Sequence, residues 1–224
     1  MGIAGVAAVA QPATDLSADD RAAIQELMTK YAQALSGCKA AEFADLFVSG
    51  AGAFASGFRG RMVGREHLIA LVESERQCSS PMGKAVAPRP NGPPVEIEVT
   101  PAGVRGLAKI GASEYQDEYV KTPRGWRFVS RSVILVAEKA AGLNANGLLA
   151  IQRLGGANLG DHYEADANGV QRLMTSGIKV DVKGGQVLGR AYLKDGSYDD
   201  QVYEKTSAGE WRVKSSTHIP AETH

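Results

Sequence analysis

The chain has 224 residues, and its 25 Lys and Arg residues balance its 25 Asp and Glu residues, so the formal net charge is zero. Proteins that neutralise nucleic-acid phosphates carry an excess of basic residues, which this chain lacks. No stretch approaches the roughly 18 apolar residues that a membrane-spanning helix needs. We therefore expect no nucleic-acid partner and no membrane partner. The length suffices for one large domain or two modest ones.

Residues 1–17 begin with an apolar run that ends in the small residues Ala8, Val9 and Ala10. Small residues at this place are typical of the cleavage site of an export signal, although no Lys or Arg precedes the run. We expect residues 1–17 to be the remnant of such a signal, and the alternative is a disordered tail. An export signal predicts a periplasmic or secreted protein, and a cytoplasmic protein is the alternative.

The chain has two cysteines, Cys38 and Cys78. Export would place them in an oxidising compartment, where a bridge between them would close a loop of about 40 residues and stabilise the fold by about 4 kcal/mol in the chain-entropy model. In a cytoplasmic protein two unpaired thiols are the better expectation. Two cysteines cannot hold a structural zinc ion alone, and the four histidines show no close ligand spacing, so no metal site is expected.

Three helices are predicted in the first part of the chain. The first follows Ser17, a good N-cap, and ends at Gly37. Its apolar residues recur at steps of three and four, and they are Ile24, Leu27, Met28, Tyr31 and Leu35. A short helix is expected over residues 40–47 and a third over 65–77, with a hairpin at 52–63 between them.

From Val95 onward apolar and polar residues alternate, which is typical of β-strands. Strands are expected over residues 95–99, 104–110, 113–121 and 126–136. Residues 18–139 thus form one predicted α+β domain.

A shift of 83 positions superimposes these strands on the last part of the chain. The matched pairs are Val95/Ile178, Ile97/Val180, Val99/Val182, Val104/Val187, Gly106/Gly189, Ala108/Ala191, Tyr115/Tyr198 and Asp117/Asp200. We interpret residues 140–224 as a β-rich extension that contains a duplicated antiparallel meander. Because the three helices are not repeated, we expect the second sheet to bury its apolar face on the first unit or on another subunit.

The order of three helices followed by a long meander, together with several short motifs, resembles the SnoaL-like branch of the nuclear-transport-factor-like superfamily. The motifs are AIQEL at 23–27, DLF at 45–47, VGREHL at 63–68, YQDEYVKT at 115–122 and GWR at 125–127. The resemblance covers about residues 18–136. It implies a cone-like curved antiparallel sheet closed by three N-terminal helices, with a pocket for an apolar or aromatic small molecule on the concave face.

Members of this branch include polyketide cyclases, dehydratases, a dehydrochlorinase, epoxide hydrolases and a diarylpropane lyase, while other members only bind ligands or partners. They generally use no cofactor, and they are commonly dimers or trimers. The resemblance therefore implies a homo-oligomer without a cofactor.

Enzymes of the dehydrochlorinase and dehydratase type use a histidine base that a carboxylate orients. In this chain Ser36 stands at the carboxylate position, and the segment expected to supply the histidine, residues 79–94, contains none. It offers Lys84, which could act as a base if an apolar pocket lowered its pKa, although a solvated lysine in a loop is the simpler interpretation. His162 of the extension could replace the missing histidine if its segment folds over the mouth of the cone.

Other candidate pocket residues follow from strand alternation. Arg131 corresponds to a pocket arginine of the dehydrochlorinase and shares a face with Val133 and Leu135. Tyr115 and Asp117 share a face of their strand, which Ser113 begins. Asp117 could be a base or only the structural partner of Arg131.

Two further residues complete the candidate site. Tyr31, on the apolar stripe of the first helix, could reach a ligand with its hydroxyl or be a packed core residue. Arg59 in the hairpin could bind a carboxylate or phenolate, or simply carry surface charge.

The sequence thus predicts a cofactor-independent lyase that removes water or a one-carbon aldehyde from an aromatic or apolar molecule, such as a lignin-derived dimer. Lys84 or Asp117 would take the proton, and Tyr31, Tyr115 and Arg131 would stabilise the developing oxyanion. One alternative is a non-catalytic small-molecule-binding protein of the periplasm. Another is an isomerase or a hydrolase on the same scaffold.

Overall fold

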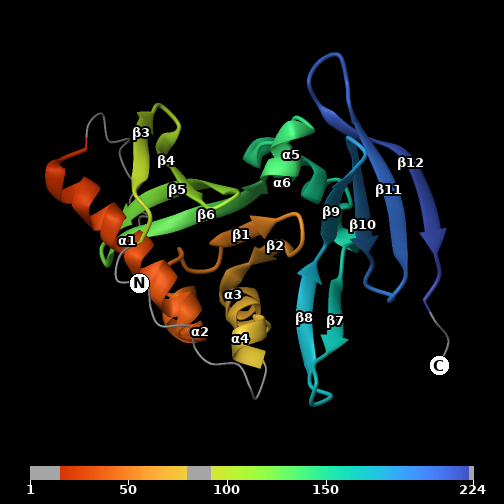
Figure 1. The fold of residues 1–224 in the computed structure, drawn as a ribbon, viewed down its shortest axis with the longest axis horizontal. Helices are drawn as coiled ribbons and strands as arrows, with labels where there is room; N and C mark the ends of the chain where they lie inside the picture. The colour runs from red at the N-terminus through yellow and green to blue at the C-terminus, as the bar shows by residue number, and fades with distance from the viewer. Residues whose placement is uncertain (1–15, 80–91, 222–224) are drawn as a thin grey trace, which may run out of the picture.

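The computed structural model describes residues 16–79 and 92–221 (Figure 1). Its N-terminal helices are α1 (Ala18–Ser36), α2 (Ala40–Ala44), α3 (Gly64–Glu73) and α4 (Arg76–Ser79). Ser17 caps α1 as expected, since its hydroxyl accepts a hydrogen bond from the backbone N–H of Asp20 at 3.1 Å. The helix predicted over 65–77 is divided in two at Ser74, and α2 ends three residues earlier than predicted.

The predicted strands are present in the first sheet. They are β1 (Ala53–Ser56), β2 (Gly60–Val63), β3 (Val95–Thr100), β4 (Gly103–Ile110), β5 (Ser113–Thr122) and β6 (Gly125–Leu135). Strands β3 to β6 form an antiparallel meander, and β1 pairs with β6 in parallel. The helix α1 covers the inner face of this meander, and the apolar side chains of helix and sheet form one core.

The C-terminal section contains two short helices and six strands. They are α5 (Val136–Ala140), α6 (Ala145–Arg153), β7 (Asp161–Ala165), β8 (Gln171–Ser176), β9 (Ile178–Lys183), β10 (Gln186–Tyr192), β11 (Tyr198–Lys205) and β12 (Trp211–Ile219), with a 3-10 turn at Gly156–Asn158. The hairpin β7–β8 extends the first sheet to eight strands through the pair Gly60 and Ser176. Strands β9 to β12 form a separate four-stranded sheet. The domain boundary at residue 139 stays a prediction, although one hairpin of the extension belongs to the first sheet.

The two meanders share their strand pairing. Val95 lies opposite Ala108 in the first meander, and Ile178 lies opposite Ala191 in the second. Both residues of the second pair are 83 positions after those of the first, as the sequence match predicted. A bulge follows Glu118 in β5 and, at the corresponding place, Val202 in β11.

The predicted match of Asp117 with Asp200 is wrong by one residue. The connection between the paired residues is one residue longer in the second meander, so Gly189 faces Gln201 where Gly106 faces Asp117. A shift of one residue places a side chain on the other face of a strand. Asp200 accordingly pairs with Arg190 at 2.7 Å instead of lying on the inner face. The hydroxyl of Tyr203 donates to Gln201 as that of Tyr119 donates to Asp117.

The second meander has a helical cover of its own, contrary to expectation. Helix α6 lies between the two sheets (Figure 1), and its buried Leu148 and Ile151 join a core with Ile178, Val180 and other residues of the second sheet. Asn144 caps α6 by accepting from the N–H of Gly147 at 2.9 Å. The second sheet therefore buries its apolar face on α6, and Ile134 of β6 in the first unit belongs to the same core, so the expected contact with the first unit is also present.

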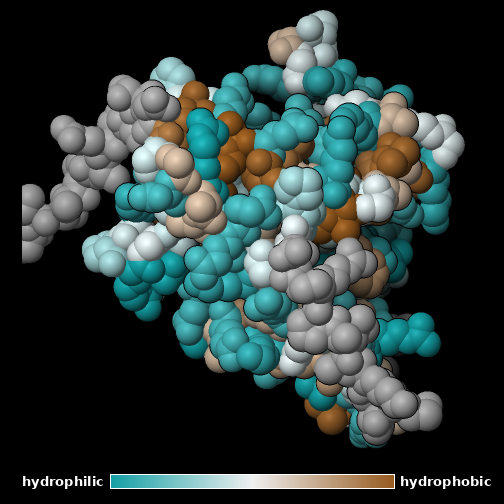
Figure 2. All heavy atoms as spheres, turned by 60° about the vertical axis from the view of Figure 1, so that its left-hand side comes forward, coloured by the Kyte–Doolittle hydropathy of each residue, from teal (hydrophilic) through white to brown (hydrophobic). Residues whose placement is uncertain are grey.

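One face of the molecule is mostly polar (Figure 2). On the face drawn in Figure 2, hydrophilic residues cover most of the surface, and the hydrophobic atoms gather mainly in its upper part. None of the helices in the described segments is long and apolar enough to span a membrane.

Candidate functional site

The candidate site lies on the inner face of the first meander, under α1. Asp117 of β5 lies directly opposite Arg131 of β6, so both side chains point to the same face. Tyr31 reaches this place from the buried stripe of α1. Arg131 is fully buried and Asp117 is 2% exposed. The strand alternation and the helical period thus bring together three of the residues that the sequence singled out.

Aromatic rings enclose the guanidinium group of Arg131. Its central carbon lies 3.9 Å from the ring centre of Tyr31, 4.4 Å from that of Tyr115 and 5.1 Å from that of Phe128. A cation over a ring face is attracted to the ring electrons, most strongly where water is excluded. The Nη1 atom also donates to the sulfur of Met28 at 3.0 Å. Arg131 is therefore held in one place by packing on several sides.

The carboxylate of Asp117 is shared between Arg131 and Tyr119. Its Oδ2 atom lies 3.7 Å from Nη1 of Arg131 and accepts a hydrogen bond from the hydroxyl of Tyr119 at 2.8 Å. Burial raises the pKa of Asp117, while the charge of Arg131 and the Tyr119 hydroxyl oppose that shift. A carboxylate with a raised pKa is a stronger base than an ordinary aspartate, which suits a group that accepts a proton.

The two tyrosines of this site stay protonated. Burial raises the pKa of Tyr31 and that of Tyr119 far above the ordinary value of 10. Both phenols therefore stay neutral, and the hydroxyl of Tyr119 already donates its hydrogen bond to Asp117.

Several buried polar atoms at this centre have no hydrogen-bond partner among the residues that the structure describes. They are Nε and Nη2 of Arg131 and Oδ1 of Asp117. Buried polar groups are nearly always satisfied, and each exception costs free energy that needs an explanation. Two charged donors and one carboxylate acceptor are therefore left over for another polar molecule.

The remaining predicted residues lie at different distances from this centre. Val133 is buried in the same core, and Tyr115 is half-buried beside Arg131. Ser113 begins β5 opposite Leu135, at the far end of the strand pair. Leu135 is 48% exposed, so the prediction that it lines the pocket is wrong. Lys84 lies outside the described residues, as do residues 1–15.

Two predicted ligand-binding residues have other partners. Arg59 is buried but forms an ion pair with Glu75 at 2.9 Å, so its charge is already neutralised. His162 stacks on Tyr192 of the second meander at 4.2 Å and pairs with Glu164. The idea that His162 replaces the missing histidine at the cone is therefore wrong.

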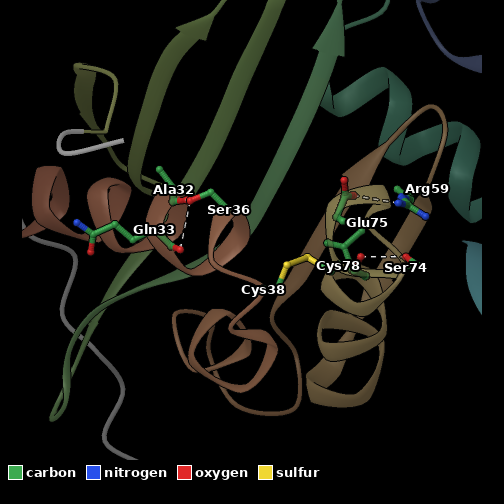
Figure 3. The surroundings of a disulfide bond; sticks show 9 residues. Ala32, Gln33, Ser36, Cys38, Arg59, Ser74, Glu75 and Cys78 are labelled. Carbon is green, nitrogen blue, oxygen red and sulfur yellow. Dashed lines mark hydrogen bonds and ion pairs between the residues drawn. A yellow bond between two sulfur atoms is a disulfide. The ribbon is translucent and has the colours of Figure 1, made fainter. Parts of the chain in front are cut away.

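The disulfide between Cys38 and Cys78 ties the end of α1 to α4 (Figure 3). Beside it, the hydroxyl of Ser36 donates to the carbonyl of Ala32 at 2.8 Å. Ser36 thus bonds within its own helix, and within residues 16–79 and 92–221 it makes no hydrogen bond to another side chain. The bridge fixes the position of α4, directly after the ion-paired Glu75.

Sequence reasoning overlooked three side chains of this site. Met28 and Phe128 contact Arg131, yet their apolar character gave no sign of a role beyond the core. Glu75 neutralises Arg59, and its position between α3 and α4 carried no motif. Within the described residues, no group of three or more His, Cys, Asp and Glu side chains is placed to hold a metal ion.

Comparison with known families matches residues 17–88 to the family model described as the SnoaL-like domain. This segment includes α1 to α4, and the resemblance expected from the motifs is thereby confirmed. No functionally curated protein matches the chain.

Several solved structures are similar to part of this chain. One is an NTF2-like protein with a cystatin-like fold from Novosphingobium aromaticivorans, with 21% identity, coverage of 58% of this chain and 89% of that one, and a TM-score of 0.42. Another is a type 2 hexachlorocyclohexane dehydrochlorinase, with 18% identity, 52% and 85% coverage, and a TM-score of 0.40. A third is a domain of unknown function from Nostoc punctiforme, with 14% identity, 62% and 96% coverage, and a TM-score of 0.39. None of these similarities bears on the activity of this chain.

Proposed function

We propose that this protein, whose residues 17–88 match the model of the SnoaL-like domain, is a lyase that eliminates water from an apolar or aromatic small molecule by acid–base chemistry, using only its own side chains. The observation that carries the proposal is the set of unpartnered atoms at the buried pair. Arg131 offers Nε and Nη2 as donors, and Asp117 offers Oδ1 as an acceptor. A substrate oxygen could accept hydrogen bonds from the two Arg131 donors, and an acidic C–H group of the substrate could give its proton to Oδ1 of Asp117.

In the proposed reaction, Oδ1 of Asp117 takes a proton from a carbon next to a carbonyl or phenol ring. Arg131 donates hydrogen bonds from Nε and Nη2 to the oxygen on which negative charge develops. A carbon–carbon double bond then forms, the neighbouring carbon–oxygen bond breaks, and hydroxide leaves. The proton held by Asp117 passes to the hydroxide, which gives water and returns the enzyme to its initial state.

The surroundings support these roles. Because Tyr31 stays protonated and packs on Arg131, it could donate to the same developing oxyanion. The rings of Tyr31, Tyr115 and Phe128 exclude water, and charge stabilisation is stronger in a dry site. Since the site is closely packed, substrate entry requires these side chains to move.

Substitution of the proposed base tests this mechanism. The protein would be incubated with a panel of hydroxylated phenolic dimers, terpenoids and polyketide-like compounds, and the products identified by mass spectrometry. We expect loss of 18 mass units from at least one compound, and a drop of at least ~100-fold in turnover for Asp117→Asn. Asp200→Asn is the matched control, because Asp200 is an ion-paired aspartate of the other meander, and it should retain full activity. Full turnover by Asp117→Asn would show that Asp117 is not the base, and Lys84→Met would then test the other candidate.

A non-catalytic binding protein is the second candidate. This candidate is favoured because Asp117 contacts both Arg131 and Tyr119, and these two contacts make Asp117 a weaker base. A binder would raise its melting temperature with a compound of the panel and convert none of them. An isomerase would give a product of unchanged mass, and a hydrolase would add water.

A further inference from the structure

A second polar pocket lies where the first sheet meets the extension. It has a volume of about 270 Å³ and is lined by Arg61 of β2, Gln152 and Arg153 at the end of α6, Leu159, and Ser176 and Gly177 at the end of β8. None of these residues belongs to the site around Arg131. The pocket is thus formed jointly by the SnoaL-like unit and the C-terminal extension.

Two positively charged side chains face this pocket without a counter-charge. Among the described residues, no carboxylate lies within ion-pair distance of Arg61 or of Arg153, whereas Arg59 two residues earlier is paired with Glu75. Burial and the nearby charge of Arg153 lower the pKa of Arg61. Guanidinium groups remain charged in proteins, so the two cations repel each other across the pocket.

The pocket also contains buried polar atoms without partners. Within the described part of the chain, Nε of Arg61 is buried without a hydrogen-bond partner; Oε1 of Gln152 is also unpartnered, but it is an acceptor and does not favour an anion. A charged N–H group that is neither solvated nor bonded costs free energy, and a bound acceptor would recover it. Asp161, which faces Ser176 across β7 and β8, is held by His67 at 3.0 Å and does not pair with either arginine.

From these observations we infer that the pocket binds a small oxyanion, a carboxylate or a phosphate, between Arg61 and Arg153. Guanidinium groups bind such anions through charge-assisted hydrogen bonds. The C-terminal end of α6 brings a negative partial charge of about half a unit, which offsets only part of the two full positive charges. Leu159 adds an apolar wall suited to the carbon part of an organic carboxylate. Bound there, the anion would link β2 to α6 and β8.

Titration calorimetry with two probes, inorganic phosphate and benzoate, tests the inference on the full-length chain at constant ionic strength. We expect at least one probe to bind at a single site. The probe that binds more tightly identifies the class of ligand. Tighter binding of phosphate would indicate a phosphate ligand held mainly by charge. Tighter binding of benzoate would indicate an organic carboxylate whose carbon part packs on Leu159. Arg61→Gln and Arg153→Gln should each weaken binding at least ~10-fold, since each removes a charged hydrogen-bond donor.

Arg212→Gln is the matched control. It removes the same charge from β12, where Arg212 is exposed and paired with Glu204, and should leave the affinity unchanged. The inference is overturned if neither probe binds, or if Arg61→Gln and Arg153→Gln bind as tightly as the natural protein. Equal weakening by Arg212→Gln would also overturn it, because binding would then follow net charge and not this pocket. Melting curves of each variant without ligand confirm that it is folded.

Discussion

Tyr203 occupies in the second meander the place that Tyr119 occupies in the first, and each ring covers a glycine of the neighbouring strand. Tyr119 lies over Gly106 and Tyr203 lies over Gly189. A side chain at either glycine would meet the ring, since an added Cβ atom would lie 2.6 Å from Tyr119 and 2.5 Å from Tyr203. The repeat therefore preserves a packing unit, although the polar partner changes from Asp117 to Gln201.

The first prediction concerns this packing unit. We expect Gly106→Ala and Gly189→Ala each to lower the free energy of unfolding by about 1–3 kcal/mol, because extra volume in a packed core forces neighbours to shift. Urea unfolding followed by circular dichroism measures the change. If the clash is the cause, adding Tyr119→Leu to Gly106→Ala should cost less than the sum of the two single changes. Unchanged stability in both alanine variants would contradict the close contact.

The second prediction concerns the buried ion pair. Arg131→Met leaves the carboxylate of Asp117 without its counter-charge, and breaking a buried pair in this way destabilises proteins by about 3–5 kcal/mol. The double variant with Asp117→Asn should regain part of this loss, because no charge then remains buried. Arg190→Met is the control, since its partner Asp200 is partly exposed and surface pairs contribute about 0–1 kcal/mol. A loss in Arg131→Met no larger than in this control would contradict the prediction.

Much of the first unit could be predicted because local rules determine it. The apolar period of α1 placed Tyr31 inward, and strand alternation placed Asp117 and Arg131 on one face. The contact between these three residues depends on the long-range pairing of β5 with β6 and on the packing of α1, which no local pattern specifies.

The errors in the second unit have separate physical causes. One extra residue in a turn reverses the faces of the following strand, so a sequence match that ignored the turn assigned Asp200 to the wrong side. The helix α6 was missed although Asn144, Leu148 and Ile151 form a cap and an apolar stripe, because a helix of nine residues gives a weak periodic signal. The unpaired charges of Arg61 and Arg153 depend wholly on tertiary structure, since the two residues are far apart in the sequence.

The third prediction concerns the contact between His67 of α3 and Asp161 of β7. The hydrogen bond to Asp161 raises the pKa of His67 above its ordinary value of 6.5, although partial burial opposes the shift. The same contact lowers the pKa of Asp161 below 3.8. A raised histidine pKa contributes stability that is complete below about pH 6.5 and is lost as the pH rises through the pKa of the folded state.

Titration of the His67 ring by NMR measures this shift directly. We expect a pKa above 6.5 in the natural protein and a lower value in Asp161→Asn, which keeps the shape but removes the charge. His218 pairs with Asp199 elsewhere, so the NMR signals of its ring should not differ between the two proteins at a given pH. An unchanged His67 pKa in Asp161→Asn would show that the two side chains do not interact in solution.

The last prediction concerns the bridge between Cys38 and Cys78, which are separated by 40 positions in the sequence. Closing a loop of this length restricts the unfolded chain and should stabilise the protein by about 4 kcal/mol in the chain-entropy model. Reduction, or the double change Cys38→Ser with Cys78→Ser, should therefore lower the unfolding free energy by similar amounts. Intact mass should rise by about two daltons on reduction, one for each thiol hydrogen. If the mass does not change, the thiols were already free. If the mass changes but stability does not, the loop between α1 and α4 is already restricted in the unfolded chain, and the entropic explanation would be wrong.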